Sequence, residues 1–392
     1  MVTIANDHSR ETVLLQHSTT LNQLKTRLGA AEYIPYDSMR NEVKTIYLNF
    51  HFLDREQISI NLQGQEGIDF AQNLIDQANR ELANNQAMRL PLHNQTPVLD
   101  PLLQYEIYKS GDGQPAIYFH ENNDLCYFVK KGRDQNNFKK IVIDEYGVDL
   151  DHVLNVFVIP PHPDSVASQT YGGIITGIAL TNAIKISGDF KNQPEIWKYS
   201  GLLNHEIGHI LGLRHSWLND GCDDTPLHSN CWNFTQNGSE CDSLVSNNIM
   251  DSNADQDAYS PCQIGVIHRS LSEEQSYVRR FLKPDYCQLN DSLPEILIER
   301  DEVWKVEKDV SRNIRIKSGV SLFIQSRLSL PENGFIFLEK DAKLILGPTA
   351  KLHNDCGKSW KGILSATKQS MVEIAPSTII ENIANNVTGA DN

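Results

Sequence analysis

The stretch from His205 to His215 reads HEIGHILGLRH, and the first part of the chain is organised around it. His205 and His209 are four residues apart, so on a helix both imidazoles project from the same face. Apolar residues recur at helical spacing from about 194 to 213, which predicts a helix there. Gly212 can adopt a left-handed backbone conformation at little cost, so we expect it to end the helix and return the chain. His215 would then lie beside the other two histidines.

Three imidazoles with a fourth position left open are the ligand set of a catalytic zinc site, whereas structural zinc sites are closed by four protein ligands. Glu206 follows the first histidine, and it is placed to act as general base and acid on a zinc-activated water. The alternative is a helix that carries histidines without a metal. Three histidines, a glutamate and a glycine at these spacings favour zinc, so we predict one catalytic Zn²⁺ bound by His205, His209 and His215.

The pattern H-E-x-x-H-x-x-G-x-x-H is the signature of the metzincin metalloproteases, which also have a methionine turn further along the chain. The segment Asn248-Ile249-Met250-Asp251 is similar to that turn. Together with the Asp223-Asp224-Thr225-Pro226 segment and four nearby cysteines, it makes residues 150 to 285 resemble the pappalysin family of metzincins. The resemblance implies a secreted zinc endopeptidase. Its fold would be α+β and zincin-like, with a mixed sheet, an active-site helix and a Met-turn at Met250.

The same resemblance implies further bonds and a second metal in the segment after His215. It implies two disulfides, Cys222–Cys241 and Cys231–Cys262, and a calcium ion with Asp223, Asp224 and Thr225 as ligands. A stretch this rich in Asp, Asn, Ser and Gly is more often a solvated loop without a metal. Hard oxygen ligands are nevertheless what calcium prefers. A cysteine zinc site is the weaker alternative for the four cysteines, because they include no C-x-x-C pair.

Two positions depart from the family pattern. The family usually places a tyrosine two residues after the turn methionine, where it helps to hold the tetrahedral intermediate, and this chain has Ser252. Tyr259 is the next tyrosine along the chain. Arginine-selective members carry an acidic residue directly before the cysteine that corresponds to Cys262, and this chain has Pro261, so arginine selectivity cannot be carried over from the family. The departure at Ser252 supports an alternative function, a metalloprotease-like binding or adhesion protein without activity.

The composition restricts the class of protein. The 392 residues carry 50 acidic side chains against 35 lysines and arginines, a net charge of −15, which disfavours a general nucleic-acid binder. No apolar run approaches the 18 or so residues that a transmembrane helix needs. The polar segment from Met1 to Gln16 has no signal-peptide core, so a secreted protein implies that the signal was trimmed. A cytosolic protein is the alternative, and the cysteine pattern disfavours it.

We predict a catalytic domain over residues 41–290. An N-terminal extension or propeptide remnant over residues 1–40 precedes it. Residues 45–52 read as a strand and 68–82 as an amphipathic helix. Further strands are expected at 105–108, 115–119 and 153–159, and a glycine-rich stretch at 171–174 leads into 179–186. In a metzincin the last strand before the active-site helix is the edge that pairs with an extended peptide substrate. A helix over 263–282 would close the domain.

The composition changes after Leu293, and residues 293–392 predict an all-β C-terminal domain. Short alternating strands recur at roughly ten-residue intervals with Gly, Pro or Asn between them. They resemble the right-handed β-helices appended to secreted bacterial proteins, so we expect a β-solenoid, with a β-sandwich as the alternative. Such a domain would bind a surface or a large substrate. Since the polar end at Asn392 soon follows a strand-like segment, we expect the natural chain to continue.

Overall fold

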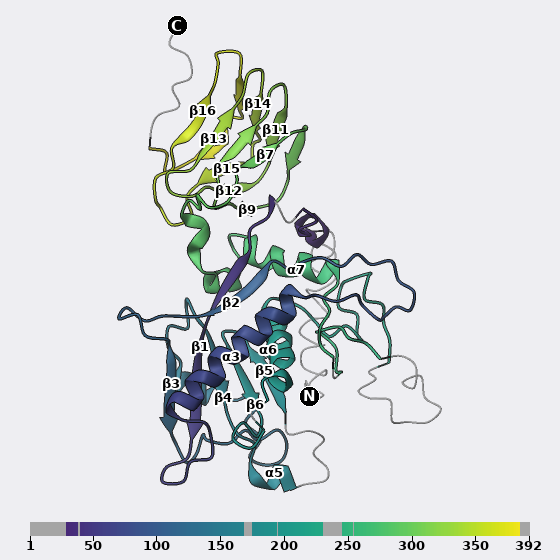
Figure 1. Cartoon of the computed structure of the whole chain (residues 1–392), viewed down its shortest axis with the longest axis vertical. Coiled ribbons are helices and arrows are strands. Elements are labelled where there is room, and N and C mark those ends of the chain that lie inside the picture. The colour runs from purple at the N-terminus through teal and green to yellow at the C-terminus, as the bar shows by residue number, and fades with distance from the viewer. Residues whose placement is uncertain are drawn as a thin grey trace. The chain divides into compact units, whose positions relative to one another are not determined.

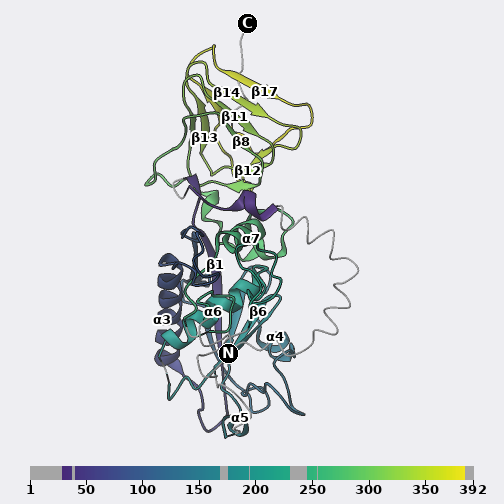
Figure 2. The same cartoon turned by 90° about the vertical axis from the view of Figure 1, so that its right-hand side faces the viewer.

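The computed structural model describes residues 29–37, 40–167, 175–193, 195–229, 245–253 and 255–384. They form two compact units, which are shown in Figures 1 and 2. The first consists of residues up to 35, 44–271 and 276–282, and the second of 36–43, 272–275 and 283–392. The short segments belong to the second unit through polar contacts. Glu42 accepts a hydrogen bond from Arg312 Nε at 2.9 Å, and the Ser272 carbonyl accepts one from Arg327 Nη2 at 2.9 Å.

The first unit is built on a six-stranded mixed sheet in the order β2-β1-β4-β6-β5, with β3 also paired to β1. All described pairs are parallel except β5 with β6, which is antiparallel. Strand β1 is long enough to pair with β2 along its first half and with β3 along its second half. The strands are β1 (Lys44–Asp54), β2 (Leu103–Ile107), β3 (Ile117–Glu121), β4 (Leu154–Val158), β5 (Thr176–Leu180) and β6 (Ala183–Ser187).

Helices cover both faces of this sheet. Helix α3 (Gly64–Ala83) and helix α6 (Trp197–Ile210) pack on one face, where they share an apolar core with inward residues of β1, β4 and β6. Helix α4 (Ile141–Tyr146) packs on the other face, in a smaller apolar cluster with Phe157 and Ile178. Figure 2 shows α3 and α4 on opposite sides of the sheet. The unit also contains η1 (Ala31–Tyr33) and α5 (Pro163–Ala167).

The edge of the sheet differs from the expected one. The stretch predicted over 179–186 belongs to a hairpin of two strands, in which Thr181 has a positive φ of 53° and the chain turns back. Strand β6, the last before α6, therefore lies inside the sheet between β4 and β5. The prediction that the last strand is the edge is wrong, and the strand before it, β5, takes that place.

The helix predicted over 263–282 is shorter than expected. Helix α7 (Pro261–Ser272) ends at Ser272, and two 3₁₀ segments follow, η4 (Tyr277–Phe281) and η5 (Pro284–Cys287). Arg279 Nη1 donates to the Leu271 carbonyl at 2.6 Å, so a side chain from beyond the helix satisfies a carbonyl of its last turn. Among the described helices, none is long and apolar enough to cross a bilayer.

The second unit is all-β and solenoid-like. Its strands stack in three parallel sheets, β7-β10-β13-β16, β8-β11-β14-β17 and β9-β12-β15-β18, and each turn of the chain adds one strand to each sheet. A β-sandwich pairs its strands antiparallel, so the solenoid prediction is the better one. The strands are β7 (Ile296–Ile298), β8 (Glu302–Trp304), β9 (Lys308–Asp309), β10 (Ile314–Ile316), β11 (Ser321–Ile324), β12 (Arg327–Ser329), β13 (Phe335–Leu338), β14 (Lys343–Leu346), β15 (Lys351–His353), β16 (Gly362–Ser365), β17 (Met371–Ile374) and β18 (Ile379–Ile380).

Apolar side chains in register fill the inside of the solenoid. Ile296, Ile314 and Ile336 stack on one sheet, and Leu322 stacks on Leu344 in the next. All five are essentially inaccessible to solvent. Because each turn buries its apolar residues only against its neighbours, the stacking itself forms the core.

Candidate metal centre

Helix α6 ends just before Gly212, as its sequence predicts. Gly212 has a φ of +94°, a conformation that costs other residues more. The Leu213 N–H donates to the Gly208 carbonyl at 2.9 Å, and the Gly212 N–H donates to the His209 carbonyl at 3.1 Å. These two bonds are the Schellman arrangement that closes a helix, and they turn the chain back toward His209.

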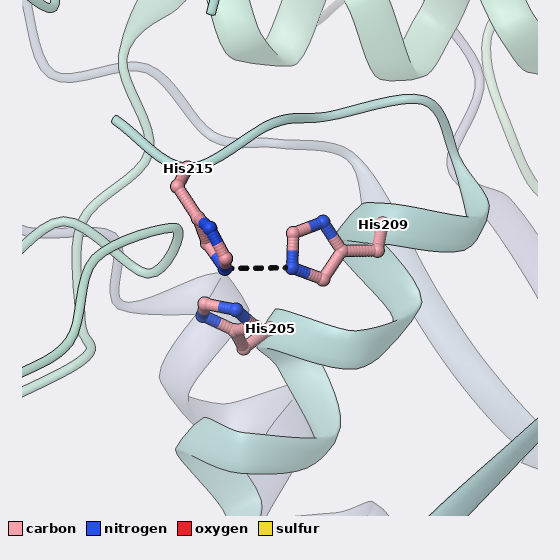
Figure 3. Close-up of side chains that lie close together, drawn as sticks. All are labelled: His205, His209 and His215. Atoms are coloured by element: carbon pink, nitrogen blue, oxygen red, sulfur yellow. Dashed lines mark hydrogen bonds between the residues drawn. The ribbon is translucent and has the colours of Figure 1, made fainter. Parts of the chain in front are cut away.

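This turn brings the three predicted histidines together. The rings of His205, His209 and His215 face one another in Figure 3. One nitrogen from each ring lies within 4.8 Å of the others. The Nε2 atoms of His209 and His215 are 3.1 Å apart. His205 and His215 are 0% and 4% exposed. His209 is half-buried, so the cluster is reached from solvent on the side of this residue.

Backbone carbonyls orient two of the three rings. His205 Nδ1 lies 2.6 Å from the Ile249 carbonyl, and His209 Nδ1 lies 3.0 Å from the Leu213 carbonyl. A carbonyl oxygen only accepts, so each Nδ1 carries the proton and each Nε2 turns a lone pair toward the cluster. Burial lowers the pKa of His205 well below its usual value and also lowers the pKa of His209. Both shifts favour the neutral imidazole, which is the form that binds a metal.

The donor set fits a zinc ion. His205 Nε2 is buried and has no hydrogen-bond partner, a costly state for a polar atom unless a ligand completes it. Three imidazole nitrogens at one point are a typical zinc ligand set. Among the described residues, one other group of His, Cys, Asp and Glu is close enough to hold a metal, namely Cys222, Asp224 and Cys262. Its two sulfurs are joined in a disulfide, so they offer no thiolate.

Glu206 is fully buried next to this cluster, and burial raises its pKa to about 8. Neither carboxylate oxygen has a hydrogen-bond partner of good geometry. The carboxylate lies against β5, because an ideal Cβ on Gly177 would come within 2.6 Å of Glu206 Oε1. A buried carboxyl group without a side-chain partner suits proton transfer more than structural support.

The predicted methionine turn packs against helix α6, next to the histidines. Met250 is fully buried, and its sulfur lies where a side chain at Gly208 would be, 2.5 Å from an ideal Cβ. The Asn248 side chain closes the turn by accepting from the Met250 N–H at 2.9 Å. The Met250 carbonyl accepts from the Ser216 N–H at 3.0 Å, which ties the turn to the residue after His215.

Tyr259 is not available in place of the tyrosine that Ser252 replaces. Its hydroxyl donates to the Asn204 carbonyl at 2.9 Å, and the side chain is 2% exposed. Tyr259 thus supports α6 from below. Ser252 is also buried, at 4% exposure.

Sequence reasoning missed three residues at the site, Gly177, Trp217 and Gln256. Gln256 Nε2 lies 3.0 Å from His205 Nδ1 and donates to the Ile249 and Asp251 carbonyls at 3.1 Å and 2.9 Å. It fixes the carbonyl that orients His205. Trp217 packs on His215. Only Trp217 had a usable signal, as an aromatic residue two positions after a predicted ligand.

The disulfide predictions Cys222–Cys241 and Cys231–Cys262 are wrong, because Cys222 is joined to Cys262 with their Cα atoms 5.6 Å apart. Asp224 explains the pairing. Its carboxylate accepts from Ser260 Oγ at 2.7 Å and from the Cys262 N–H at 3.0 Å, so it holds the segment around Cys222 on the start of α7. Cys231 and Cys241 lie outside the described residues. Of the remaining three cysteines, Cys287 pairs with Cys356 and Cys126 is free and buried.

The calcium ligands proposed from the resemblance bond within the protein. The two Asp224 oxygens accept from Ser260 and from the Cys262 N–H of α7, and Thr225 Oγ1 donates to Asp220 Oδ2 at 2.6 Å. Asp223 belongs to neither candidate metal group among the described residues. Calcium binding by Asp223, Asp224 and Thr225 stays a prediction.

Part of the chain is similar in sequence to known metallopeptidases. Residues 140–278 match the model of the metallo-peptidase family M12B, reprolysin-like. This stretch contains the three histidines, Glu206 and Met250. No curated protein matches the chain.

Two solved structures of the same protein are similar to this chain at low identity. Mature mirolysin of Tannerella forsythia, in complex with a cleaved peptide, is 15% identical with a TM-score of 0.42, and the match covers 62% of this chain and 96% of that one. A mutant of Tannerella forsythia promirolysin is 14% identical with a TM-score of 0.43, over 68% of this chain and 94% of that one.

Proposed function

We propose that the chain is a zinc-dependent endopeptidase that hydrolyses peptide bonds in proteins. The observation that carries the proposal is the convergence of three imidazole nitrogens next to the buried Glu206, which has no side-chain hydrogen-bond partner. His205, His209 and His215 would hold the zinc, which leaves one position open. A zinc ion bound there would polarise the scissile carbonyl and lower the pKa of the attacking water.

Glu206 is the proposed general base and acid. It takes the proton from the attacking water and later passes it to the leaving amine, because it directly follows the first proposed ligand in the chain and its carboxylate is buried. Burial, the largest cause, raises its pKa to about 8, which favours the protonated form at neutral pH. A cation within a few ångströms favours the carboxylate, so metal loading would place Glu206 in its basic form.

Strand β5 is the proposed contact for the substrate backbone. It ends the sheet and pairs with β6 on one side, so among the described strands its other side is unpaired. An extended peptide would add there as a further strand, recognised first by its backbone. Gly177 and Ala179 are small residues that alternate along β5, and Gly177 lies beside the Glu206 carboxylate. A peptide bound at β5 would therefore pass close to the proposed base.

The pappalysin type and export from the cell are finer proposals. The Asp-Thr-Pro segment at 224–226 and the Met-turn support the type. The Cys222–Cys262 and Cys287–Cys356 disulfides support an oxidising compartment, because such bonds rarely persist in the cytosol. The solenoid-like second unit is the proposed binding element for a surface or a large substrate.

The second candidate function is a metalloprotease-like binding protein without activity. It is favoured by Ser252 and by the engagement of Tyr259 with α6, since neither residue offers a free phenol hydroxyl. The intact ligand set and Glu206 favour the enzyme. The endopeptidase and the binding protein would differ in peptide turnover and not in metal content.

A peptide library decides between them. The full chain is loaded with one equivalent of zinc and incubated with the library, and the products are identified by mass spectrometry. The enzyme cleaves internal peptide bonds, loses this activity in a zinc chelator and regains it when zinc is restored. Zinc-loaded, folded protein that cleaves no peptide would support the binding protein.

A further inference from the structure

The third histidine of the cluster has an aromatic neighbour that no motif explains. The indole of Trp217 lies flat against the His215 imidazole, with ring centroids 4.0 Å apart and an interplanar angle of 13°. Among the three ring contacts within the cluster, His205 with His209 and His209 with His215 are edge-on at 79° and 78°, and His205 with His215 is tilted at 41°. The Trp217 contact is therefore a stack over one face of a proposed ligand.

The backbone fixes this stack. Ser216 separates His215 and Trp217 in the sequence, and its N–H donates to the Met250 carbonyl at 3.0 Å. The Leu218 N–H donates to the His215 carbonyl at 3.2 Å, which closes a tight turn over 215–218. The turn holds both side chains, so Trp217 restricts the rotation of His215 about its own bonds. His205 and His209 are oriented by hydrogen bonds to backbone carbonyls, and the stack orients His215 in addition to its polar contacts.

Metal binding changes the electrostatics of this contact. Coordination withdraws electron density from an imidazole and leaves it partly positive. The face of an indole is electron-rich and attracts positive charge more strongly than the face of any other side chain. The stack is consequently more favourable in the loaded protein than in the empty one. By linkage, an interaction that strengthens on binding must raise the affinity for the metal.

We propose that Trp217 is a positioning residue that raises zinc affinity by stacking on His215. The inference rests on the proposed zinc site but not on peptidase activity. It predicts that an aromatic face at position 217 is required, and that apolar bulk alone is insufficient. The expected contribution to affinity is about two- to thirtyfold, the range of such contacts between exposed and desolvated sites.

The test compares full-length wild type with Trp217→Phe and Trp217→Leu. Zinc affinity is measured at fixed pH by competition with a chelator of known affinity, with no peptide present. Trp217→Leu should bind zinc about two- to thirtyfold more weakly, and Trp217→Phe should lie between it and wild type. Equal affinities for Trp217→Leu and wild type, or for Trp217→Phe and Trp217→Leu, would overturn the proposal. Trp197→Leu is the matched control, because Trp197 is 67% exposed and makes no described ring contact with the histidines.

A spectroscopic readout keeps the test valid if Trp217→Leu does not fold. The chain has five tryptophans, and a zinc ion bound to a ring stacked on one of them should change its fluorescence. The zinc-induced change should be present in wild type and in Trp197→Leu and largely lost in Trp217→Phe. A full change in Trp217→Phe would show that the signal comes from elsewhere and would count against the stack. Wild type that binds no zinc would instead overturn the proposed function, so the two failures are distinguishable.

Discussion

The carboxylate of Glu206 fills the space that a side chain at Gly177 would occupy. An ideal Cβ at position 177 would lie 2.6 Å from Glu206 Oε1 and 2.9 Å from Cδ, distances that real Cβ atoms do not tolerate. Gly177 lies on β5, in register with Ile186 of β6. The strand that we propose for substrate binding and the proposed general base are thus in direct contact, and a larger residue at 177 must displace one of them.

Gly177→Ala should lower peptidase activity without removing the metal. The added methyl group displaces the Glu206 carboxylate from the position proposed for proton transfer. A displacement of about 1 Å can lower the rate roughly a hundredfold. We expect kcat to fall about ten- to a hundredfold, with zinc content unchanged. The control is Gly111→Ala, because an ideal Cβ at Gly111 has no neighbour within 4 Å. Unchanged kcat in Gly177→Ala would show that the contact with Glu206 does not position the base.

A second histidine pair predicts how stability depends on pH. His51 is fully buried on β1, where its Nδ1 lies 2.9 Å from His120 Nε2 and its Nε2 lies 3.0 Å from Asn155 Oδ1. The amide oxygen accepts, so His51 Nε2 donates and Nδ1 accepts from His120. A proton on Nδ1 would face the N–H of His120. Burial, with the neighbouring His120 as a smaller cause, lowers the pKa of His51 to about 3.

Because the folded pKa of His51 lies below its unfolded value near 6.5, the unfolded chain binds more protons at acidic pH. The contribution of His51 to the free energy of unfolding is fully present above about pH 6.5 and is lost as the pH falls toward 3. Between pH 7 and pH 5 this residue should cost about 2 kcal/mol of the free energy of unfolding. Urea titrations should show a shallower pH dependence for His51→Phe, which cannot be protonated. Parallel pH profiles for the two proteins would contradict this account.

The disulfide pattern is open to a direct check. Peptide mapping under non-reducing conditions should recover Cys222 linked to Cys262 and Cys287 linked to Cys356, with Cys126 alkylated only after unfolding. In the chain-entropy model, a cross-link spanning 40 residues stabilises the folded chain by about 4 kcal/mol, so Cys222→Ser should be clearly less stable. A Cys222–Cys241 peptide would contradict the structure and restore the pairing that the family resemblance implies.

The histidine cluster was predictable because its parts are local in sequence. His205, His209 and His215 belong to one helix and the turn after it, and Gly212 alone directs that turn. The spacing of residues therefore carries almost all of the geometry. The solenoid was predictable for a similar reason, since its strands repeat at short intervals and each turn packs on the next.

Features that depend on contacts between distant segments were missed. The Cys222–Cys262 pairing follows from Asp224 docking on the start of α7, and no local pattern shows this. Strand β5 became the edge because the chain turns at Thr181, a residue that rarely adopts a positive φ. The early end of α7 likewise depends on Arg279, which reaches back to the Leu271 carbonyl.

The central claim is that the three histidines hold a zinc ion and that Glu206 moves the proton. The most direct test is the activity of zinc-loaded Glu206→Ala on one peptide that the wild type cleaves, with the metal content of both proteins measured by elemental analysis. The account predicts one zinc per chain in both proteins and a kcat about 10²- to 10⁴-fold lower in the variant, the usual contribution of a positioned acid–base group. A variant that keeps both its zinc and its activity would contradict the account, because the proton would then pass through another group.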